Sequence, residues 1–295
     1  MKQKNKMLLS ELSLLLVALL WGGGFIVVKN SLNSISPHWL LAVRFGLAAL
    51  LMLLCFGKHL KKANPRTVLS GITAGGLVYL GFLTQTVGAQ HTTAGKNAIL
   101  TASYVVFVPF VYWLLKRKKP SGVQVLSAFL CFAGVALLLY KKDMNLSDIN
   151  KGDLYTLLCG LFFAMHIAFV GVAAKKHDAL ALATLQMLSC AAIALTVAFT
   201  GGSPMPKMMS METGLSMLYL GVLSTFFAYL MQTIAQKYAQ PTHVSILLSL
   251  ECLFGCVFSV IIYKDVFTPL MWFGTALAFI AVVVSSRAGD GFAET

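Results

Sequence analysis

Ten long apolar segments follow one another along the chain and leave almost no sequence between them. A helix needs about 20 mostly apolar residues to cross a bilayer, so each segment is a candidate membrane-spanning helix. The spans are expected at 12–28, 38–57, 68–88, 97–115, 121–140, 153–174, 181–200, 214–236, 243–263 and 268–286. The sequence therefore predicts an all-α polytopic membrane protein with ten transmembrane helices and no soluble catalytic domain.

The second half of the chain also repeats the first. A shift of 147 positions places 81–137 on 228–284 without a gap, so that Gln85 and Thr86 fall on Gln232 and Thr233. The first two spans repeat with a shift of 142, and the five extra residues fit the loop that begins at Gly201. Because each copy holds five spans, an odd number, the second copy enters the membrane from the opposite face. Two inverted repeats are expected, over residues 1–142 and 143–295, a design that places transporter substrate sites between the copies.

Charge supports the same class and indicates an orientation. Only 11% of the residues are charged and 58% are hydrophobic, against about a quarter charged in soluble domains. If the N-terminus is cytoplasmic, the cytoplasmic segments hold 15 Lys and Arg residues and the opposite loops hold 7. Such an excess is typical of cytoplasmic loops, so the net charge of +13 indicates membrane orientation rather than nucleic-acid binding. A multi-pass protein of the cell membrane with both termini in the cytoplasm is expected.

Several classes of site have no support in the sequence. The six cysteines all fall within predicted spans, and Cys252 and Cys256 alone provide too few ligands for a structural zinc site. The sequence contains no phosphate-binding P-loop, so we expect no ATP motor, no metal and no cofactor. It does not indicate whether the protein is a monomer or a homodimer.

Short stretches resemble the drug/metabolite transporter superfamily, EamA type, in their order along the whole chain. Trp21-Gly22-Gly23-Gly24-Phe25 with Lys29 resembles the family's first-span pattern, and Ser36-Pro37 with Arg44-Phe45 resembles its second. Asn97–Thr101 with Pro109, and Leu250-Glu251 with Lys264-Asp265 and Gly274, resemble the fourth and the last two spans. The resemblance implies a central cavity surrounded by spans one to four and six to nine, with spans five and ten peripheral. Cys252 stands where the family usually has the Pro that would kink span nine, and Asp265 where it usually has Glu.

Two charged residues within the spans are the main candidates for chemistry. A charge inside the bilayer costs a few kcal/mol or more and usually faces the bundle interior. Arg44, in span two, either anchors a substrate carboxylate or phosphate or ties span two to a neighbour. Glu251, in the middle of span nine, either binds a cation or a coupling proton or is a paired structural residue.

Uncharged polar and aromatic residues complete the predicted cavity wall. His166 is either a hydrogen-bonded packing residue or a contact for substrate or protons. Gln85 and Gln232 lie toward opposite faces of the membrane, and the repeat places Gln186 opposite Arg44. The wall is predicted to consist of Trp21, Arg44, Tyr79, Gln85, Tyr104, His166, Gln186, Tyr229, Gln232 and Glu251.

The sequence thus predicts a secondary active transporter that moves a small organic metabolite by alternating access. Arg44 and Glu251 together suit a zwitterion such as an amino acid, and Glu251 is the candidate for coupling to protons. A nucleotide-sugar or lipid-linked substrate is the alternative within transport. An intramembrane enzyme built on Glu251 and His166 is the alternative outside it. The expected partners are the lipid bilayer and a small-molecule substrate, with no nucleic acid.

Overall fold

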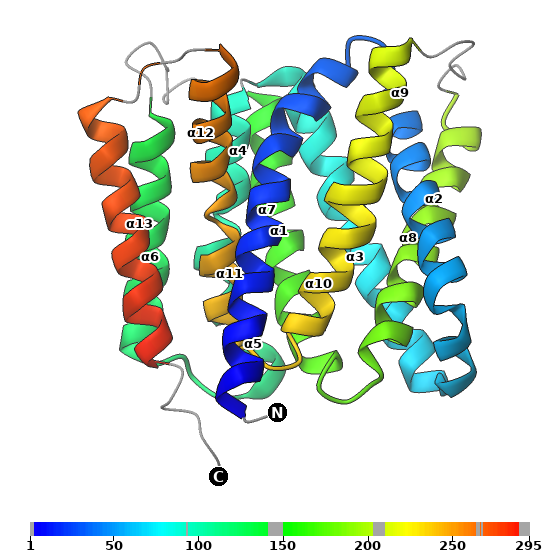
Figure 1. The fold of residues 1–295 in the computed structure, drawn as a ribbon, viewed down its shortest axis with the longest axis horizontal. Coiled ribbons are helices and arrows are strands. Elements are labelled where there is room, and N and C mark those ends of the chain that lie inside the picture. The colour runs from blue at the N-terminus through cyan, green and yellow to red at the C-terminus, as the bar shows by residue number, and fades with distance from the viewer. Residues whose placement is uncertain are drawn as a thin grey trace.

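A computed structural model describes residues 3–92, 94–140, 150–202, 210–263, 266 and 268–288. The described chain is helical throughout, and its helices stand side by side as one bundle (Figure 1). Nine segments are long and apolar enough to cross a membrane, and the shorter apolar helix Pro269–Ser285 supplies a tenth. The predicted fold, ten spans in two inverted five-helix repeats, is confirmed.

The first repeat begins with α1 (Gln3–Ser31) and α2 (Pro37–Phe56), followed by the short 3-10 helix η1 (Gly57–Lys62). The third span is α3 (Pro65–His91), and the fifth is α6 (Gly122–Leu139). The fourth span consists of two helices, α4 (Ala94–Ala102) and α5 (Tyr104–Lys116). Helix starts follow local signals, since Pro65 is in the first turn of α3 and the Asn64 side chain accepts a hydrogen bond from the Thr67 N–H.

The second repeat follows the same order. It begins with α7 (Lys151–Ala173) and α8 (Ala179–Thr200). The eighth span comprises α9 (Met211–Leu218), the π-helix η2 (Tyr219–Phe227) and α10 (Ala228–Ala235). The ninth span is divided into α11 (Pro241–Leu248) and α12 (Glu251–Tyr263), and α13 (Pro269–Ala288) is the tenth. The start of α1 and the end of α13 lie at the same face of the bundle, at the bottom of Figure 1.

The fourth and ninth spans are interrupted at matching positions of the two repeats. Each contains a serine, Ser103 or Ser249, whose hydroxyl donates to the carbonyl three residues earlier, at 2.6 and 2.8 Å. Local hydrogen bonds of this kind satisfy backbone groups that a break in a membrane helix would otherwise leave unpaired. The ninth span is therefore broken even though Cys252 replaces the family's proline.

The π-helix explains part of the length difference between the repeats. A π-helix normally carries a local insertion relative to an α-helix. The uninterrupted correspondence between the repeats begins at Ala228, directly after η2 ends at Phe227. The extra length was expected in the loop after Gly201, so the structure places some of it inside the eighth span instead.

Close helix packing brings the middle of the ninth span against α1. A Cβ atom at Gly22 would lie 2.7 Å from the Glu251 carbonyl oxygen and 2.8 Å from the Gly255 nitrogen. Membrane helices associate largely through such close packing, because lipid supplies little hydrophobic drive between them. At the far edge of the bundle α6 packs against α13, where Gly134 faces Gly274 (Figure 1). The fifth and tenth spans are thus peripheral, as the resemblance implies.

Candidate functional site: a central cavity between the repeats

A cavity lies in the middle of the bundle and draws its wall from both repeats. Its volume of about 50 Å³ has room for only a few molecules the size of water, each of which needs about 10–15 Å³ on this measure. The residues of the wall come from α1 to α5 in the first repeat, and from α7, η2, α10 and α12 in the second. The two helix breaks and the π-helix therefore all adjoin the cavity.

Eight of the ten residues predicted for the wall line this cavity, namely Trp21, Arg44, Gln85, Tyr104, His166, Tyr229, Gln232 and Glu251. Gln186 and Tyr79 do not. Gln186 lies behind the wall, where its amide joins His166 to Thr233, and Tyr79 is buried in the apolar core shared by α2, α3 and α8. No described residue of α8 reaches the cavity, so the expectation that span seven surrounds it is wrong.

Glu251 is the only carboxylate on the wall, and it is the first residue of α12. The Tyr104 hydroxyl donates to Glu251 Oε1 at 3.3 Å, and Tyr104 is the first residue of α5. These two residues are exactly one repeat shift of 147 positions apart, so each occupies the same place in its own copy. Glu251 is 4% exposed, and no described cationic side chain forms an ion pair with it.

Arg44 links α2 to the π-helix of the other repeat. Its Nε donates to Thr225 Oγ1 at 2.5 Å, and its Nη2 donates to Ser224 Oγ at 3.1 Å and more weakly to the Ser224 carbonyl at 3.4 Å. The guanidinium carbon also lies 4.2 Å from the centre of the Phe82 ring, a favourable cation–π contact. Among the described residues no carboxylate pairs with Arg44, so its charge is held by hydroxyls, a carbonyl and an aromatic face.

Tyr229 is the centre of an aromatic wall. Its ring centre lies 5.4 Å from that of Trp21, 5.7 Å from that of His166 and 6.2 Å from that of Phe82. The Trp21 indole donates to the Ser224 carbonyl at 2.8 Å, so the π-helix also fixes this ring. The wall thus offers an apolar surface beside the two charged groups, the usual composition of a small-molecule site.

His166 and the glutamines differ in how well they are paired. His166 Nε2 lies 3.1 Å from Gln186 Oε1, and Gln186 Nε2 donates to Thr233 Oγ1 at 2.8 Å. Gln85 Nε2 donates to Thr101 Oγ1 at 3.3 Å. Gln232 is 1% exposed, and neither atom of its amide has a hydrogen-bond partner among the described residues.

Some cavity residues were missed as site residues by the sequence reasoning. Lys29 was counted as a loop charge, yet it lines the cavity and donates to the Ala89 carbonyl at 2.5 Å, near the end of α3. Phe163 is the repeat counterpart of Trp21, so the repeat itself was a signal for it. Ser224 has no such signal, because its contacts depend on the π-helix. The remaining wall residues are Gly24, Phe25, Val28, Phe82, Ala89, Asn97 and Ile167. No cluster of three or more potential metal ligands occurs in the described part of the chain.

Comparison with known proteins identifies the family. The model of the EamA-like transporter family matches residues 8–140 and again 150–287. An uncharacterized transporter of Archaeoglobus fulgidus is 32% identical over 95% of this chain and 87% of its own length. The uncharacterized transporter YoaV of Bacillus subtilis is 23% identical over 74% and 76%, and a chloroplastic WAT1-related protein of Arabidopsis thaliana is 22% identical over 89% and 66%. A solved crystal structure shares the fold, with a TM-score of 0.78 at 13% identity over 97% of this chain and 99% of its own. The chain therefore belongs to the EamA-like transporter family and is a transporter rather than an enzyme.

Proposed function

We propose that the protein is a secondary active transporter that carries a small organic metabolite through the central cavity by alternating access. The observation that carries the proposal is the cavity itself. It is shared by the two inverted repeats and holds one carboxyl group and one guanidinium, neither of them in an ion pair with a described residue. Inverted repeats with a site between them are the architecture on which alternating access operates.

The charges of the wall favour a zwitterion, such as an amino acid. Arg44 complements a carboxylate and Glu251 an ammonium group, while the aromatic wall around Tyr229 accepts an apolar portion. The small cavity volume argues against a nucleotide-sugar or lipid-linked substrate, which needs far more space. An intramembrane enzyme is not supported, because His166 is engaged by Gln186 and the named relatives are transporters.

Flux measurements on purified protein in proteoliposomes test this proposal. Labelled amino acids, nucleosides, sugars and cationic drugs would be compared with protein-free vesicles under an imposed pH gradient. Uptake of at least one amino acid, saturable and competed by unlabelled substrate, is the expected result. If every amino acid fails while another class is transported, the zwitterion assignment is wrong and transport stands; if nothing is transported, the function itself is wrong.

Glu251 is the residue we propose to couple transport to protons, because it is the one carboxyl group on the cavity wall. The variant Glu251→Gln keeps the size and a hydrogen-bonding oxygen for Tyr104, but it cannot bind and release a proton. It is expected to abolish uptake driven by the pH gradient while eluting as a folded protein. The matched control, Glu212→Gln in the exposed first turn of α9, should retain uptake. Unchanged pH dependence in Glu251→Gln would exclude Glu251 as the coupling residue.

A further inference from the structure

The side-chain amide of Gln232 is buried on the cavity wall without a protein partner. The side chain belongs to α10, and the residue is 1% exposed. Neither Nε2 nor Oε1 forms a hydrogen bond with any described residue. Buried amides are nearly always paired, and an unpaired one costs about 1–3 kcal/mol. A fold that retains Gln at this place therefore calls for a physical reason.

The first repeat shows how the same glutamine is satisfied when it is structural. Gln85, the counterpart of Gln232, donates from Nε2 to the Thr101 hydroxyl at 3.3 Å. The shift of 147 that relates Gln85 to Gln232 places Leu248 at the position of Thr101. Leu248 has no hydrogen-bonding side chain and is fully buried among apolar residues. The second repeat has thus kept the glutamine and replaced its partner.

The nearby polar groups are occupied by one another. His166 pairs with Gln186, and Gln186 donates to Thr233, the residue directly after Gln232. Arg44 is held by the π-helix, and Glu251 accepts from Tyr104. Gln232 therefore differs from the other polar residues of the wall in having both a donor and an acceptor available to whatever fills the cavity.

We propose that Gln232 selects the ligand by binding a group that carries a hydrogen-bond donor beside an acceptor, as a primary carboxamide does. This rests on the proposed function and narrows its substrate class to small carboxamide-bearing compounds. The side-chain amide of Gln232 accepts from the ligand N–H and donates to the ligand carbonyl. A site built to hydrogen-bond a polar group rejects an analogue that lacks it, because its own buried group is then left unpaired.

The test compares ligands of similar shape that differ in the amide. L-asparagine is paired with L-leucine, L-glutamine with L-methionine, and nicotinamide serves as a carboxamide that is not an amino acid. In proteoliposomes the wild type should favour each carboxamide over its apolar counterpart. The variant Gln232→Leu should raise the KM for L-asparagine about tenfold, the equivalent of one net hydrogen bond of roughly 1.4 kcal/mol, and leave that for L-leucine unchanged or lower.

A second variant removes the amide from the ligand without altering Gln232. Leu248→Thr rebuilds the arrangement of Gln85 and Thr101, so the new hydroxyl competes for the Gln232 amide. It should weaken L-asparagine uptake in the same direction as Gln232→Leu. The matched control is Leu247→Thr, one position along α11, which adds the same hydroxyl on a different face of the helix and should leave the preference for carboxamides intact.

Thermal unfolding in detergent supplies a readout that does not depend on transport. Gln85→Leu breaks a bond to Thr101 and should lower the unfolding temperature, whereas Gln232→Leu should leave it unchanged or raise it. Equal losses in the two variants would show that Gln232 is bonded within the protein and would overturn the proposal. Wild-type transport of L-leucine without preference for L-asparagine would also overturn it, while leaving the transport function in place. Absence of flux for every probe and every class would instead reject the transport function.

Discussion

Three positions near the cavity differ between the repeats, and their side chains show how the differences are used. Arg44 corresponds to Gln186, and Gly24 corresponds to His166. In the second copy Gln186 and His166 bond to each other, 3.1 Å apart. In the first copy Gly24 has no side chain to offer, so Arg44 reaches across to Ser224 instead. The change from His to Gly thus accompanies a bond within one repeat becoming a bond between the two.

Arg44 therefore has a structural role beside any role in binding, and Arg44→Lys should reveal it. Lysine keeps the charge but cannot donate from two separated nitrogens to Thr225 and Ser224. Hydrogen bonds made by charged groups contribute about 1.5–3 kcal/mol, so the unfolding temperature should fall clearly. Differential scanning fluorimetry in detergent measures it. Arg66→Lys at an exposed position is the control and should behave as wild type. If Arg44→Lys is as stable as wild type, its bonds to the π-helix carry little weight.

At the scale of helices, the sequence predicted the spans well but not their interruptions. The spans follow from the length of apolar sequence that a bilayer requires. The breaks in the fourth and ninth spans have no such signal, because neither Ser103 nor Ser249 is a residue that ends a helix by itself. The π-helix arises in an apolar stretch that also suits an α-helix, and its carbonyl at Ser224 is satisfied only by contacts from α1 and α2. These features depend on tertiary contacts, which hydrophobic periodicity does not encode.

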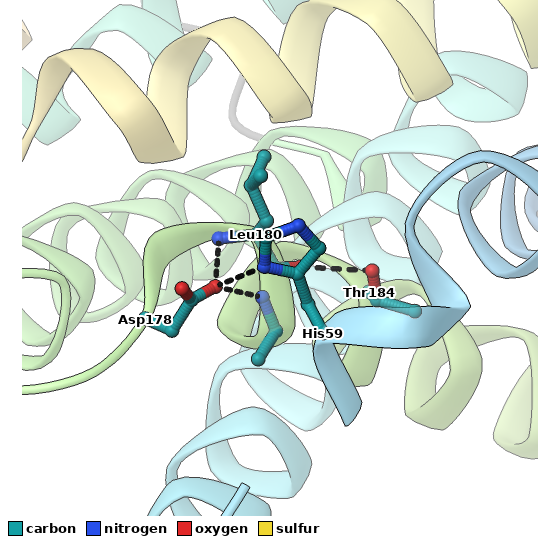
Figure 2. Close-up of polar contacts among 5 residues, drawn as sticks. His59, Asp178, Leu180 and Thr184 are labelled. Carbon is teal, nitrogen blue, oxygen red and sulfur yellow. Dashed lines mark hydrogen bonds and ion pairs between the residues drawn. The ribbon is translucent and has the colours of Figure 1, made fainter. Parts of the chain in front are cut away.

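A polar contact joins the ends of two neighbouring helices at one face of the bundle. Asp178 caps α8, accepting from the backbone N–H groups of Leu180 and Ala181 at 3.0 and 2.9 Å, and its Oδ1 lies 3.2 Å from His59 Nδ1 in η1 (Figure 2). Burial on its own would raise the pKa of the Asp178 carboxyl. The hydrogen bonds from Ala181, His59 and Leu180 outweigh it and hold the pKa below its ordinary value of 3.8. The ionised form is therefore the one that the fold favours.

Asp178→Asn tests this contact, because Asn caps a helix as well as Asp but carries no charge. A carboxyl whose pKa is lowered by folding stabilises the protein above its ordinary pKa and loses that contribution as the pH falls through the folded value. The variant should unfold at a slightly lower temperature than wild type at neutral pH, by less than about 1 kcal/mol, as for other exposed pairs. The difference should vanish as the pH falls below 3.8. A difference that is the same at every pH would contradict the electrostatic account, and Glu212→Gln provides the control.

At the scale of the whole molecule, the orientation in the membrane is open to direct test. The excess of Lys and Arg, 15 against 7, predicts that both termini lie in the cytoplasm. Alkaline phosphatase, which becomes active only outside the cytoplasm, would be fused in a bacterial host. Fusion after Ala288 should be inactive, and fusion after Tyr140, at the end of the fifth span, should be active. The reverse pattern would show that the repeats are inserted the other way round.

The candidate site was partly predictable for a related reason. Charged and aromatic residues in apolar spans stand out in the sequence, and eight of the ten chosen residues lie on the cavity wall. Gln186 was chosen because the repeat places it opposite Arg44, but α8 packs behind α2 and α3 rather than facing the cavity. Tyr79 lies on the face of α3 that packs into the core. Which face of a span points inward depends on packing between the copies, and a hydrophobic span gives little indication of it.

The bond between Tyr104 and Glu251 has a consequence for how such a chain can arise. Two positions related by a two-fold axis are equally far from it, so a bonded pair of this kind must lie beside the axis. In a symmetric dimer of one ancestral repeat, a Glu at this place would meet its own copy, and two carboxyl groups so close cannot both ionise. A fused, duplicated chain escapes that conflict, since one copy can hold the acid and the other a phenol. Fusion thus allows a lone, freely titrating carboxyl group at the centre of the molecule, where a homodimer would have two that share a proton.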